Sequence, residues 1–387
     1  MNHTHRIGLD AHLLNLAGTY RSAGISWYIY HLIQHLEPAP DLQYTLFLSE
    51  PRAHFAHCTI ARSRLPTHKP IVRIFWEQVL QPLALRHAQI DVLHALAFAG
   101  PRFISIPWLA TIYDVSFMRY PESFPRWNRM YLTWAVRDAV QRADGLIAIS
   151  KSTKRDLVEW FGAAPERIRV IYCGKDAAFA PATDRAALDA WRQARGVPDK
   201  MILFVGTIEP RKNIARLIRA FARAKRAARL PHVLVLIGAR GWQYAEVDAT
   251  LAQENLTNAV QFIGYVPQAE LPRWYQAADL FVYPSLYEGF GMPPLDAMAS
   301  GVPVVTSNAA SLPEVVGDAA LQVSPTDDAA LADAIVRALT DEALRAQMIA
   351  RGLTQAAQFS WERAGRETVA LYRALLESRR GVTDAAR

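Results

Sequence analysis

The chain has 387 residues and a mass of 43.3 kDa, with 51% hydrophobic and 20% charged residues. This composition is typical of a globular protein rather than a disordered one, and the length suffices for two domains. No signal-peptide-like apolar run opens the chain, and no apolar stretch approaches the roughly 20 residues that span a bilayer. The two cysteines, Cys58 and Cys173, lack metal-type spacing, so we expect free thiols in a reducing compartment.

The chain is basic, with a formal net charge of +7 and a pI of about 9.4. A positive balance suits a nucleic acid, an anionic membrane surface or an anionic substrate. No zinc-type spacing or RNP-like run occurs in the sequence, which makes nucleic acid the weakest of the three. We therefore expect no nucleic-acid partner.

The first half alternates between strand-like and helix-like segments. Strands are expected over residues 6–10, 42–48, 91–95, 108–112, 145–149 and 167–171, and helices over residues 24–36 and 126–142. A further helix begins after Ser150, a good N-cap residue. The loop from Asn15 to Gly24, between the first strand and the first helix, is rich in small residues.

A basic stretch interrupts this alternation. Residues 54–73 include Arg62, Arg64, Lys69 and Arg73, and residues 74–86 follow as an amphipathic, aromatic-rich helix that contains a proline. Basic residues beside such a helix are typical of contact with an anionic membrane surface. The alternative is an ordinary solvated face over a core helix.

The second half repeats the alternation after a predicted linker and hinge over residues 173–199, which hold two glycines and two prolines. Strands are expected over residues 201–206, 232–237, 260–263, 279–283, 302–306 and 320–323, and a last apolar helix over residues 361–376. Strands that alternate with helices in both halves predict an α/β fold with two parallel sheets, each covered on both faces.

The segment from Tyr283 to Thr306 predicts a strand, a glycine loop, a helix and a strand. Backbone N–H groups at a helix start, here residues 290–295, form a natural anion site. Two carboxylates border it, Glu288 in the loop and Asp296 on the expected first turn. Carboxylates beside an anion site repel the anion itself and suit hydrogen bonds from hydroxyl groups. A ligand that bears both phosphates and hydroxyls indicates a nucleotide sugar. The alternative is that Asp296 merely suits the helix start and Glu288 is a solvated loop charge.

A second candidate loop follows the strand at 201–206. Gly206 ends this strand and is a candidate donor-binding residue. Arg211 and Lys212 lie in what we expect to be an exposed loop before the next helix. Loops at such strand ends bind ligands in α/β sheets, and guanidinium and ammonium groups both suit phosphate oxygens. Surface charge is the alternative. Gly238 opens a third loop, residues 238–244, which is a candidate contact for the nucleotide base.

Residues 287–305, YEGFGMPPLDAMASGVPVV, resemble the donor-site signature of the retaining glycosyltransferases of family 4. The resemblance covers nearly the whole chain and is stronger in the second half. It implies the GT-B fold, with two Rossmann-like domains whose parallel sheets face each other across a cleft. Residues 1–175 would bind the acceptor and residues 176–360 the nucleotide sugar, with the helix over 361–387 crossing back to the first domain.

The resemblance also assigns roles to residues. Arg211 and Lys212 would clamp the diphosphate, together with the helix start near Phe290, Gly291 and Met292. The family has two glutamates with seven residues between them. At the first position this chain has Glu288, which is expected to orient the sugar hydroxyls, and at the second it has an aspartate. That aspartate, Asp296, is expected to bind the ribose diol, although its side chain is one methylene shorter.

The first half departs from the family pattern at two places. In the loop near Gly24, which approaches the donor phosphates in the family, Ser26 and Trp27 differ from the usual G-I-G-R-Y. At the end of the strand over 108–112 the family has His-Asp, with the histidine facing the transferred sugar. This chain has Tyr113 and Asp114 there, which the resemblance places among the catalytic residues. A phenol with a pKa near ~10 can donate or accept a hydrogen bond but is a poor general base at neutral pH.

We therefore expect a retaining, metal-independent hexosyltransferase, since no Asp-x-Asp pair is present to hold a metal. Its donor would be GDP-mannose and its acceptor a saccharide or lipid-linked hydroxyl in surface-polysaccharide or lipopolysaccharide biosynthesis. No cofactor is expected besides this co-substrate. The place of action would be the cytoplasm, with peripheral contact at the inner face of the cytoplasmic membrane. The alternatives are a GT-B-fold nucleotide-sugar epimerase and a transferase that uses a UDP- or dTDP-sugar.

Overall fold

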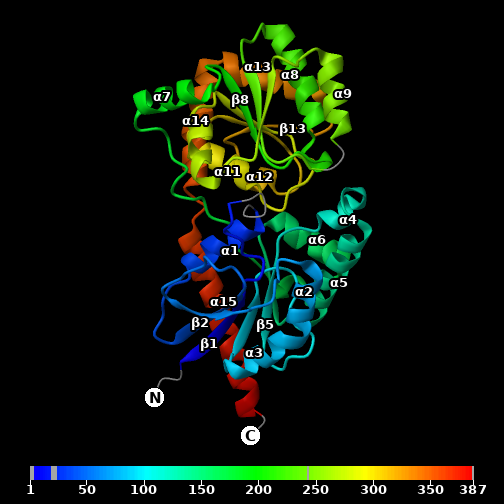
Figure 1. Cartoon of the computed structure of the whole chain (residues 1–387), viewed down its shortest axis with the longest axis vertical. Helices are drawn as coiled ribbons and strands as arrows, with labels where there is room; N and C mark the ends of the chain where they lie inside the picture. Colours follow the sequence, from blue (N-terminus) through cyan, green and yellow to red (C-terminus); the bar gives the residue numbers. More distant parts are fainter. Residues whose placement is uncertain (1–3, 19–23, 242–243, 386–387) are drawn as a thin grey trace. The chain divides into compact units, whose positions relative to one another are not determined.

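The computed structural model describes residues 4–18, 24–241 and 244–385. The chain divides into two compact units, residues 1–174 with 361–387 and residues 175–360. Each unit has one parallel sheet with helices on both faces (Figure 1). These two α/β layered units confirm the predicted fold class. The predicted loops over 15–24 and 238–244 lie partly outside the described residues, at 19–23 and 242–243.

The first unit has a seven-stranded sheet in the order β3-β2-β1-β4-β5-β6-β7. Its strands are β1 (His5–Asp10), β2 (Leu42–Leu48), β3 (Cys58–Arg62), β4 (Val92–Ala95), β5 (Trp108–Ile112), β6 (Gly145–Ala148) and β7 (Ile168–Val170). The strands β1, β4, β5 and β6 are almost entirely buried. The edge strand β3 is half exposed and was missed in the sequence, because its residues carry no continuous apolar run.

The helices of the first unit lie between these strands. They are α1 (Ile25–Gln34), α2 (Pro70–Phe75), α3 (Gln81–His87), α4 (Ser116–Arg119), α5 (Arg126–Arg142), α6 (Lys151–Phe161) and α15 (Trp361–Ala385). A π-helical stretch, η2 (Trp76–Leu80), joins α2 to α3 just before Pro82. The hydroxyl of Ser150 accepts a hydrogen bond from the Thr153 N–H, which confirms the predicted N-cap of α6.

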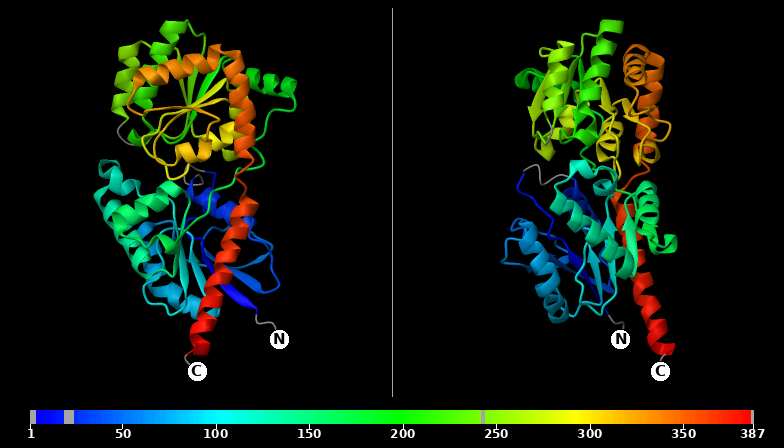
Figure 2. Two further views of the ribbon diagram at one scale, coloured as in Figure 1. Left: turned by 180° about the vertical axis from the view of Figure 1, so that it is seen from behind. Right: turned by 90° about the vertical axis from the view of Figure 1, so that its right-hand side faces the viewer.

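The long helix α15 belongs to the first unit and packs against α1 and β4 (Figure 2). The Tyr372 hydroxyl lies 2.7 Å from His94 Nδ1, and Arg373 forms an ion pair with Asp41. A Cβ atom at Gly365 would lie 2.0 Å from the His35 carbonyl oxygen. Only glycine therefore permits α15 to approach the end of α1 this closely.

The second unit has a six-stranded sheet in the order β10-β9-β8-β11-β12-β13. Its strands are β8 (Met201–Val205), β9 (Val233–Ile237), β10 (Val260–Gly264), β11 (Leu280–Tyr283), β12 (Val304–Ser307) and β13 (Leu321–Val323). Its helices are α7 (Arg185–Arg195), α8 (Ile214–Ala228), α9 (Ala245–Glu254), α10 (Leu271–Gln276), α11 (Met292–Ala299), α12 (Leu312–Val316), α13 (Asp328–Thr340) and α14 (Glu342–Ala356). The three central strands β8, β11 and β12 are wholly buried, as their apolar sequences predict.

The range 173–199, which the sequence predicts as a linker, contains helix α7. The side chain of Asp184 caps this helix by accepting from the Ala187 N–H, and Gly196 ends it in a left-handed conformation. Trp191 packs edge-to-face on Trp274 of α10. The helix is therefore part of the second unit's packing.

Both cysteines are free thiols, as the sequence predicts. Among the described residues, no helix is both long enough and apolar enough to cross a membrane.

Candidate active site

The carboxyl ends of β8 and β11 meet where the strand order of the second sheet reverses. From β8 the sheet continues through β9 to β10 on one side and through β11 to β13 on the other. Ligands of open α/β sheets bind at such a reversal. The loop after β8 carries Arg211 and Lys212, and the loop after β11 carries Glu288. The topology therefore brings together the three charged residues that the sequence predicts as a site.

Glu288 bridges both cations. Lys212 Nζ donates to Glu288 Oε1 at 2.6 Å and to the Tyr283 hydroxyl at 2.6 Å. Arg211 Nη1 donates to Glu288 Oε2 at 3.1 Å, and its Nη2 donates to Glu209 Oε1 at 2.8 Å. Lys212 is only 7% exposed and Glu288 8%. The sequence expectation of an exposed loop is therefore wrong for Lys212, because Glu288 and Tyr283 satisfy its ammonium group in the interior.

The protonation of this cluster follows from burial and from its opposite charges. Burial lowers the pKa of Lys212, and Glu288 opposes this shift only in part. Burial by itself disfavours the Glu288 carboxylate, but Lys212 and Arg211 together lower its pKa to about 2. Burial and the neighbouring Glu288 raise the pKa of Tyr283 well above its usual value. The cluster therefore holds a fixed carboxylate between two cationic groups, in surroundings where electrostatic interactions are strong.

Close backbone packing positions the loop after β8. A Cβ atom at Gly238 would lie 1.9 Å from the Gly206 carbonyl oxygen, and Gly238 has a φ of +148°. Only glycine fits there, so the loops after β8 and β9 approach each other through Gly206 and Gly238. The two predicted donor-binding glycines are thus neighbours. Trp242 and Gln243, in the predicted base-contacting loop, lie outside the described residues.

Helix α11 begins as predicted but offers fewer donors. Its N-cap is Gly291, with a φ of +119°, and its first residue is Met292. Pro293 and Pro294 have no N–H, and the Leu295 N–H already bonds to the Gly291 carbonyl at 3.3 Å. The predicted row of donors over residues 290–295 is therefore wrong in extent, because two prolines occupy the first turn.

Asp296 lies on the second turn of α11 rather than on the predicted first turn. Its side chain is half-buried. Burial and the negative charge of Asp176 raise the pKa of Asp296 well above its usual value. The raised pKa shifts this carboxyl group towards its protonated form, which both donates and accepts hydrogen bonds. Such a group suits a diol.

Three residues that the sequence did not point to hold the loops of the site in place. Glu209 anchors the second guanidinium nitrogen of Arg211. Asn213 donates to the carbonyl oxygens of Pro284 and Pro325, and the buried Ser311 hydroxyl lies 2.6 Å from the carbonyl oxygen of Phe290. Of the three, only Asn213 could have been noticed in the sequence. It has a left-handed conformation directly before α8, which asparagine tolerates better than most residues.

The remaining predicted residues lie in the first unit. The Tyr113 hydroxyl is buried and donates to the Leu96 carbonyl at 2.6 Å, and burial raises its pKa well above the usual value. Asp114 accepts from the N–H and the hydroxyl of Ser116, at the start of α4. Gly24 is the N-cap of α1 and has a φ of +59°, a conformation that glycine adopts readily. The geometry therefore gives Tyr113 and Asp114 structural contacts.

A buried polar group also lies at the strand-order reversal of the first sheet, between β1 and β4. Gln81 donates to Asp10 at 2.9 Å, and His12 Nδ1 lies 2.9 Å from the Thr67 hydroxyl. Burial lowers the pKa of His12. For Asp10 and His12 the sequence signal was their place at the end of the first strand, which the sequence analysis did not use.

Comparison with known proteins agrees with this architecture. The family described as Glycosyl transferases group 1 matches residues 188–355, and Glycosyltransferase Family 4 matches residues 22–179. O-antigen chain mannosyltransferase B of Escherichia coli is 34% identical over 295 residues, which cover 76% of this chain and 77% of that protein. Serotype-specific mannosyltransferase WbdA of Escherichia coli is 29% identical over 318 residues, 78% of this chain, but the match spans only 39% of WbdA.

The structure resembles sucrose-phosphate synthase from Thermosynechococcus elongatus, with a TM-score of 0.77, 24% identity and coverage of 97% of this chain and 100% of that one. This likeness defines the class: the protein has the GT-B fold, an α/β fold with two parallel sheets. The chain belongs to the group 1 glycosyltransferases, family 4. It is therefore a glycosyltransferase, as the sequence resemblance implied.

Proposed function

We propose that this glycosyltransferase is a retaining, metal-independent hexosyltransferase that moves mannose from GDP-mannose to a hydroxyl group of a saccharide or lipid-linked acceptor. The observation that carries the proposal is the Arg211–Lys212–Glu288 cluster at the strand-order reversal of the second sheet. The sugar and the role in surface-polysaccharide assembly are supported by the two mannosyltransferases to which the chain is similar, one of them an O-antigen chain enzyme.

Arg211 and Lys212 would neutralise the charge that grows on the leaving diphosphate. Arginine offers two parallel N–H donors and lysine a compact charge, and both suit phosphate oxygens. Because Glu288 and Glu209 already hold these cations, the charges are oriented before the donor arrives. Preorganised charge of this kind is usually the largest single contribution to catalysis.

Glu288 and Asp296 would divide the recognition of the donor. Glu288, ionised and fixed, would accept hydrogen bonds from sugar hydroxyls. Asp296, whose pKa is raised, would hold the ribose diol as a donor and an acceptor. Gly206, Gly238, Phe290, Gly291 and Met292 complete the proposed donor site of the second unit as backbone contacts.

The proposed reaction needs no strong side-chain base. The acceptor oxygen would bond to the anomeric carbon on the face from which the diphosphate oxygen departs, and that oxygen would take the acceptor proton. Tyr113 and Asp114 would then shape the acceptor side rather than move a proton, in keeping with the buried phenol.

The place of action that we propose is the cytoplasmic side of the membrane, where a lipid-linked acceptor would be met by peripheral contact. This proposal rests on the family and on the basic balance of the chain.

A thermal-shift panel tests the donor assignment. A ligand that binds only the folded state raises stability in proportion to the logarithm of its concentration over Kd. GDP-mannose and GDP are expected to raise the unfolding temperature, whereas UDP- and dTDP-sugars at the same concentration leave it unchanged. A shift with UDP- or dTDP-sugars alone would overturn the GDP-mannose assignment. Conversion of a nucleotide sugar to its epimer without acceptor would overturn the transferase reaction.

A further inference from the structure

A ridge of aliphatic and aromatic side chains is exposed along α2, η2 and α3. Ile71 is 83% exposed, Phe75 51%, Val79 49% and Leu83 59%. They are spaced four residues apart, so they follow one side of the helical segment. An exposed apolar row of this kind marks an interaction surface.

The ridge is additional to the core face of the same segment. Trp76, Glu77, Gln81 and Leu85 point inward and are buried. A four-residue spacing drifts around an α-helix of 3.6 residues per turn, but the wider π-helical turns of η2 reverse part of this drift. The ridge therefore stays on one face from Ile71 to Leu83 instead of winding into the core.

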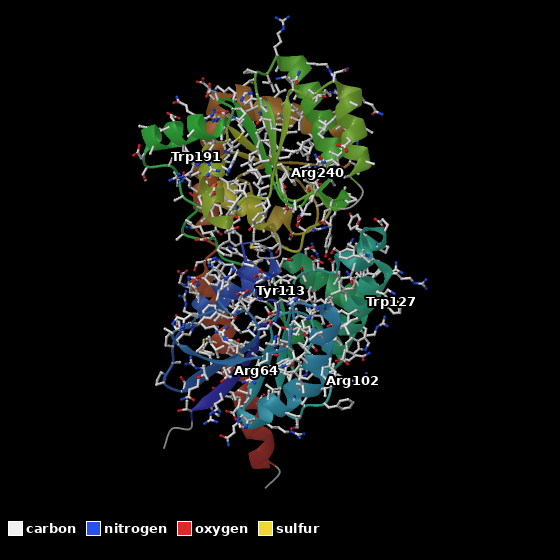
Figure 3. All side chains as sticks on the ribbon, in the orientation of Figure 1. Arg64, Arg102, Tyr113, Trp127, Trp191 and Arg240 are labelled. Atoms are coloured by element: carbon white, nitrogen blue, oxygen red, sulfur yellow. The ribbon has the colours of Figure 1, made fainter. Side chains whose placement is uncertain are left out.

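Neighbouring elements of the first unit extend this apolar surface. The amide of Gln78 donates to the Gly100 carbonyl and accepts from the Arg102 N–H, which fixes the loop that carries the exposed Phe103. On α5, Trp127 is exposed, and Figure 3 shows Arg102 and Trp127 on the side of the first unit that carries α2 and α5.

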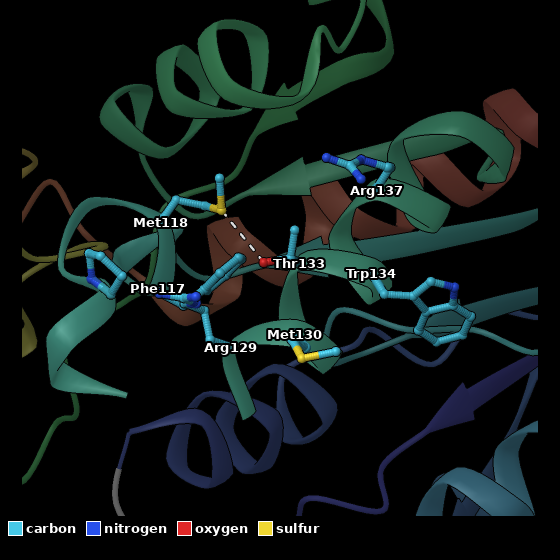
Figure 4. Close-up of a pocket in the computed structure, with 8 residues that line it drawn as sticks. Phe117, Met118, Arg129, Met130, Thr133, Trp134 and Arg137 are labelled. Atoms are coloured by element: carbon cyan, nitrogen blue, oxygen red, sulfur yellow. Dashed lines mark hydrogen bonds between the residues drawn. The ribbon is translucent and has the colours of Figure 1, made fainter. Parts of the chain in front are cut away.

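A pocket of about 550 Å³ lies beside α5, between it and α4 (Figure 4). It is lined by Phe117, Met118, Pro121, Arg129, Met130, Thr133, Trp134 and Arg137. Two guanidinium groups beside apolar side chains suit a ligand with an anionic head and an apolar body. An anionic lipid is such a ligand.

These segments carry a net positive charge. Residues 62–87 contain five Arg or Lys and one Glu, and residues 100–142 contain six Arg and three acidic residues. Their surplus of seven positive charges equals the formal net charge of the whole chain. Two of the acids are buried and paired, Glu77 with Arg73 and Asp138 with Arg142. Arg119 is paired outside these ranges, with Asp156 and Glu159 of α6. The segments that carry the ridge and its neighbouring loop and helices are therefore basic in balance.

We infer that this surface docks on an anionic lipid bilayer, with Ile71, Phe75, Val79, Leu83 and Phe103 entering the interface and Lys69, Arg86 and Arg102 facing the head groups. We call these eight residues the docking face. Apolar area and attraction to anionic lipid together determine interfacial binding. The inference deepens the peripheral membrane contact of the proposed function and rests on it.

Charge complementarity favours a bilayer over a second copy of the chain. A symmetric dimer through the docking face would set the same basic surface against itself. Like charges brought together in this way repel. An anionic bilayer is complementary to both features at once, because it takes up apolar side chains and attracts cations.

Flotation of the full-length chain with vesicles tests the inference without any donor or acceptor. The vesicles are phosphatidylglycerol mixed with phosphatidylcholine, or phosphatidylcholine alone. The ridge variant is Phe75→Ser/Leu83→Ser, and its control is Ile263→Ser/Leu353→Ser, two exposed apolar residues of the second unit. The charge variant is Lys69→Gln/Arg86→Gln/Arg102→Gln, and its control is Arg185→Gln/Arg223→Gln/Arg337→Gln, three exposed arginines of the second unit.

The unmodified chain is expected to float with anionic vesicles and to be released as ionic strength rises from about 0.1 M to about 1 M. The ridge variant should bind at least about tenfold more weakly. The charge variant should lose about 100-fold, since each basic residue near an anionic surface contributes about fivefold. Both controls should bind like the unmodified chain, and all variants should keep its circular dichroism and unfolding temperature.

Equal binding of the ridge variant and its control would overturn the inference, as would equal binding to both kinds of vesicle. A dimer of the unmodified chain that the ridge variant abolishes, without any vesicle binding, would assign the face to a second copy instead. Vesicle binding by a chain that fails to bind GDP-mannose would leave the docking face standing and remove only the donor assignment.

Discussion

Removal of the Lys212 ammonium should strongly destabilise the second unit. Lys212→Met keeps most of the side-chain volume but leaves Glu288 with one cation, Arg211, and leaves the Tyr283 hydroxyl without its donor. Loss of one partner of a buried ion pair costs about 3–5 kcal/mol. Because Arg211 still contacts Glu288 at 3.1 Å, we expect the lower end, about 3 kcal/mol.

The expected loss can be measured by calorimetry. For a unit of 186 residues, about 3 kcal/mol corresponds to a fall of roughly 6–12 °C in the midpoint of its own transition. Glu288→Gln should cost a similar amount, because it leaves Lys212 charged and buried. The double variant Lys212→Met/Glu288→Gln should cost less than the sum of the two by about 2 kcal/mol, since no unpaired charge of this pair remains.

A surface ion pair of the same unit provides the matched control. Arg226 donates to Glu254 at 2.9 Å, and the arginine is 64% exposed. Glu254→Gln should cost less than about 1 kcal/mol. If the free energy of unfolding of Lys212→Met lies within about 1 kcal/mol of that of the unmodified chain, as is expected for Glu254→Gln, the buried cluster does not stabilise the fold as argued.

The remaining predictions concern catalysis and pH. Arg211→Ala should lower kcat by about 10²–10³; near-normal turnover in a steady-state assay would remove it from the clamp. Asp296→Asn should raise the donor KM with little change in kcat, because the ribose does not change in the reaction; a fall in kcat alone would reverse the assignment. The Glu288 pKa, lowered from 4.5 to about 2, should give about 3 kcal/mol of stability that is complete above pH 4.5 and lost as pH falls towards 2. Acid unfolding followed by fluorescence should show this loss, and Glu288→Gln should lack it. Activity should survive EDTA; abolition by EDTA with recovery on adding Mg²⁺ or Mn²⁺ would refute metal independence.

Much of the fold could be predicted because buried parallel strands have continuous apolar sequences. β8 and β11 are buried at every residue and have five and four consecutive apolar residues. The bounds of α5, Arg126–Arg142, were predicted to the residue. β3 could not be seen, because an edge strand with charged and half-exposed residues lacks that pattern.

The candidate site was predictable as a set of residues but less so as a geometry. Strand ends place Arg211, Lys212 and Glu288 at one edge of the sheet, and that part follows from topology. The burial of Lys212 depends on Glu288 and Tyr283, which lie more than 70 residues away along the chain. Sequence spacing carries no information about such long-range pairing, so the expectation of an exposed loop was wrong.

The first unit was less predictable at its site. The family histidine position is Tyr113 here, and only the structure places its hydroxyl on the Leu96 carbonyl. Exposure likewise had to come from the structure, because the alternation of apolar residues over 74–86 does not say which row faces outward. The ridge at Ile71 to Leu83 is the outward row.

The most direct test of the central claim is calorimetric titration of the full chain with GDP-mannose. The unmodified chain should bind GDP-mannose, and Arg211→Ala should weaken binding at least about tenfold, the loss expected when a charge-assisted hydrogen bond to phosphate is removed. Arg223→Gln, a control at an exposed arginine on α8, should bind like the unmodified chain. Equal affinity of Arg211→Ala and Arg223→Gln for GDP-mannose would contradict the placement of the donor diphosphate at the β8–β11 reversal.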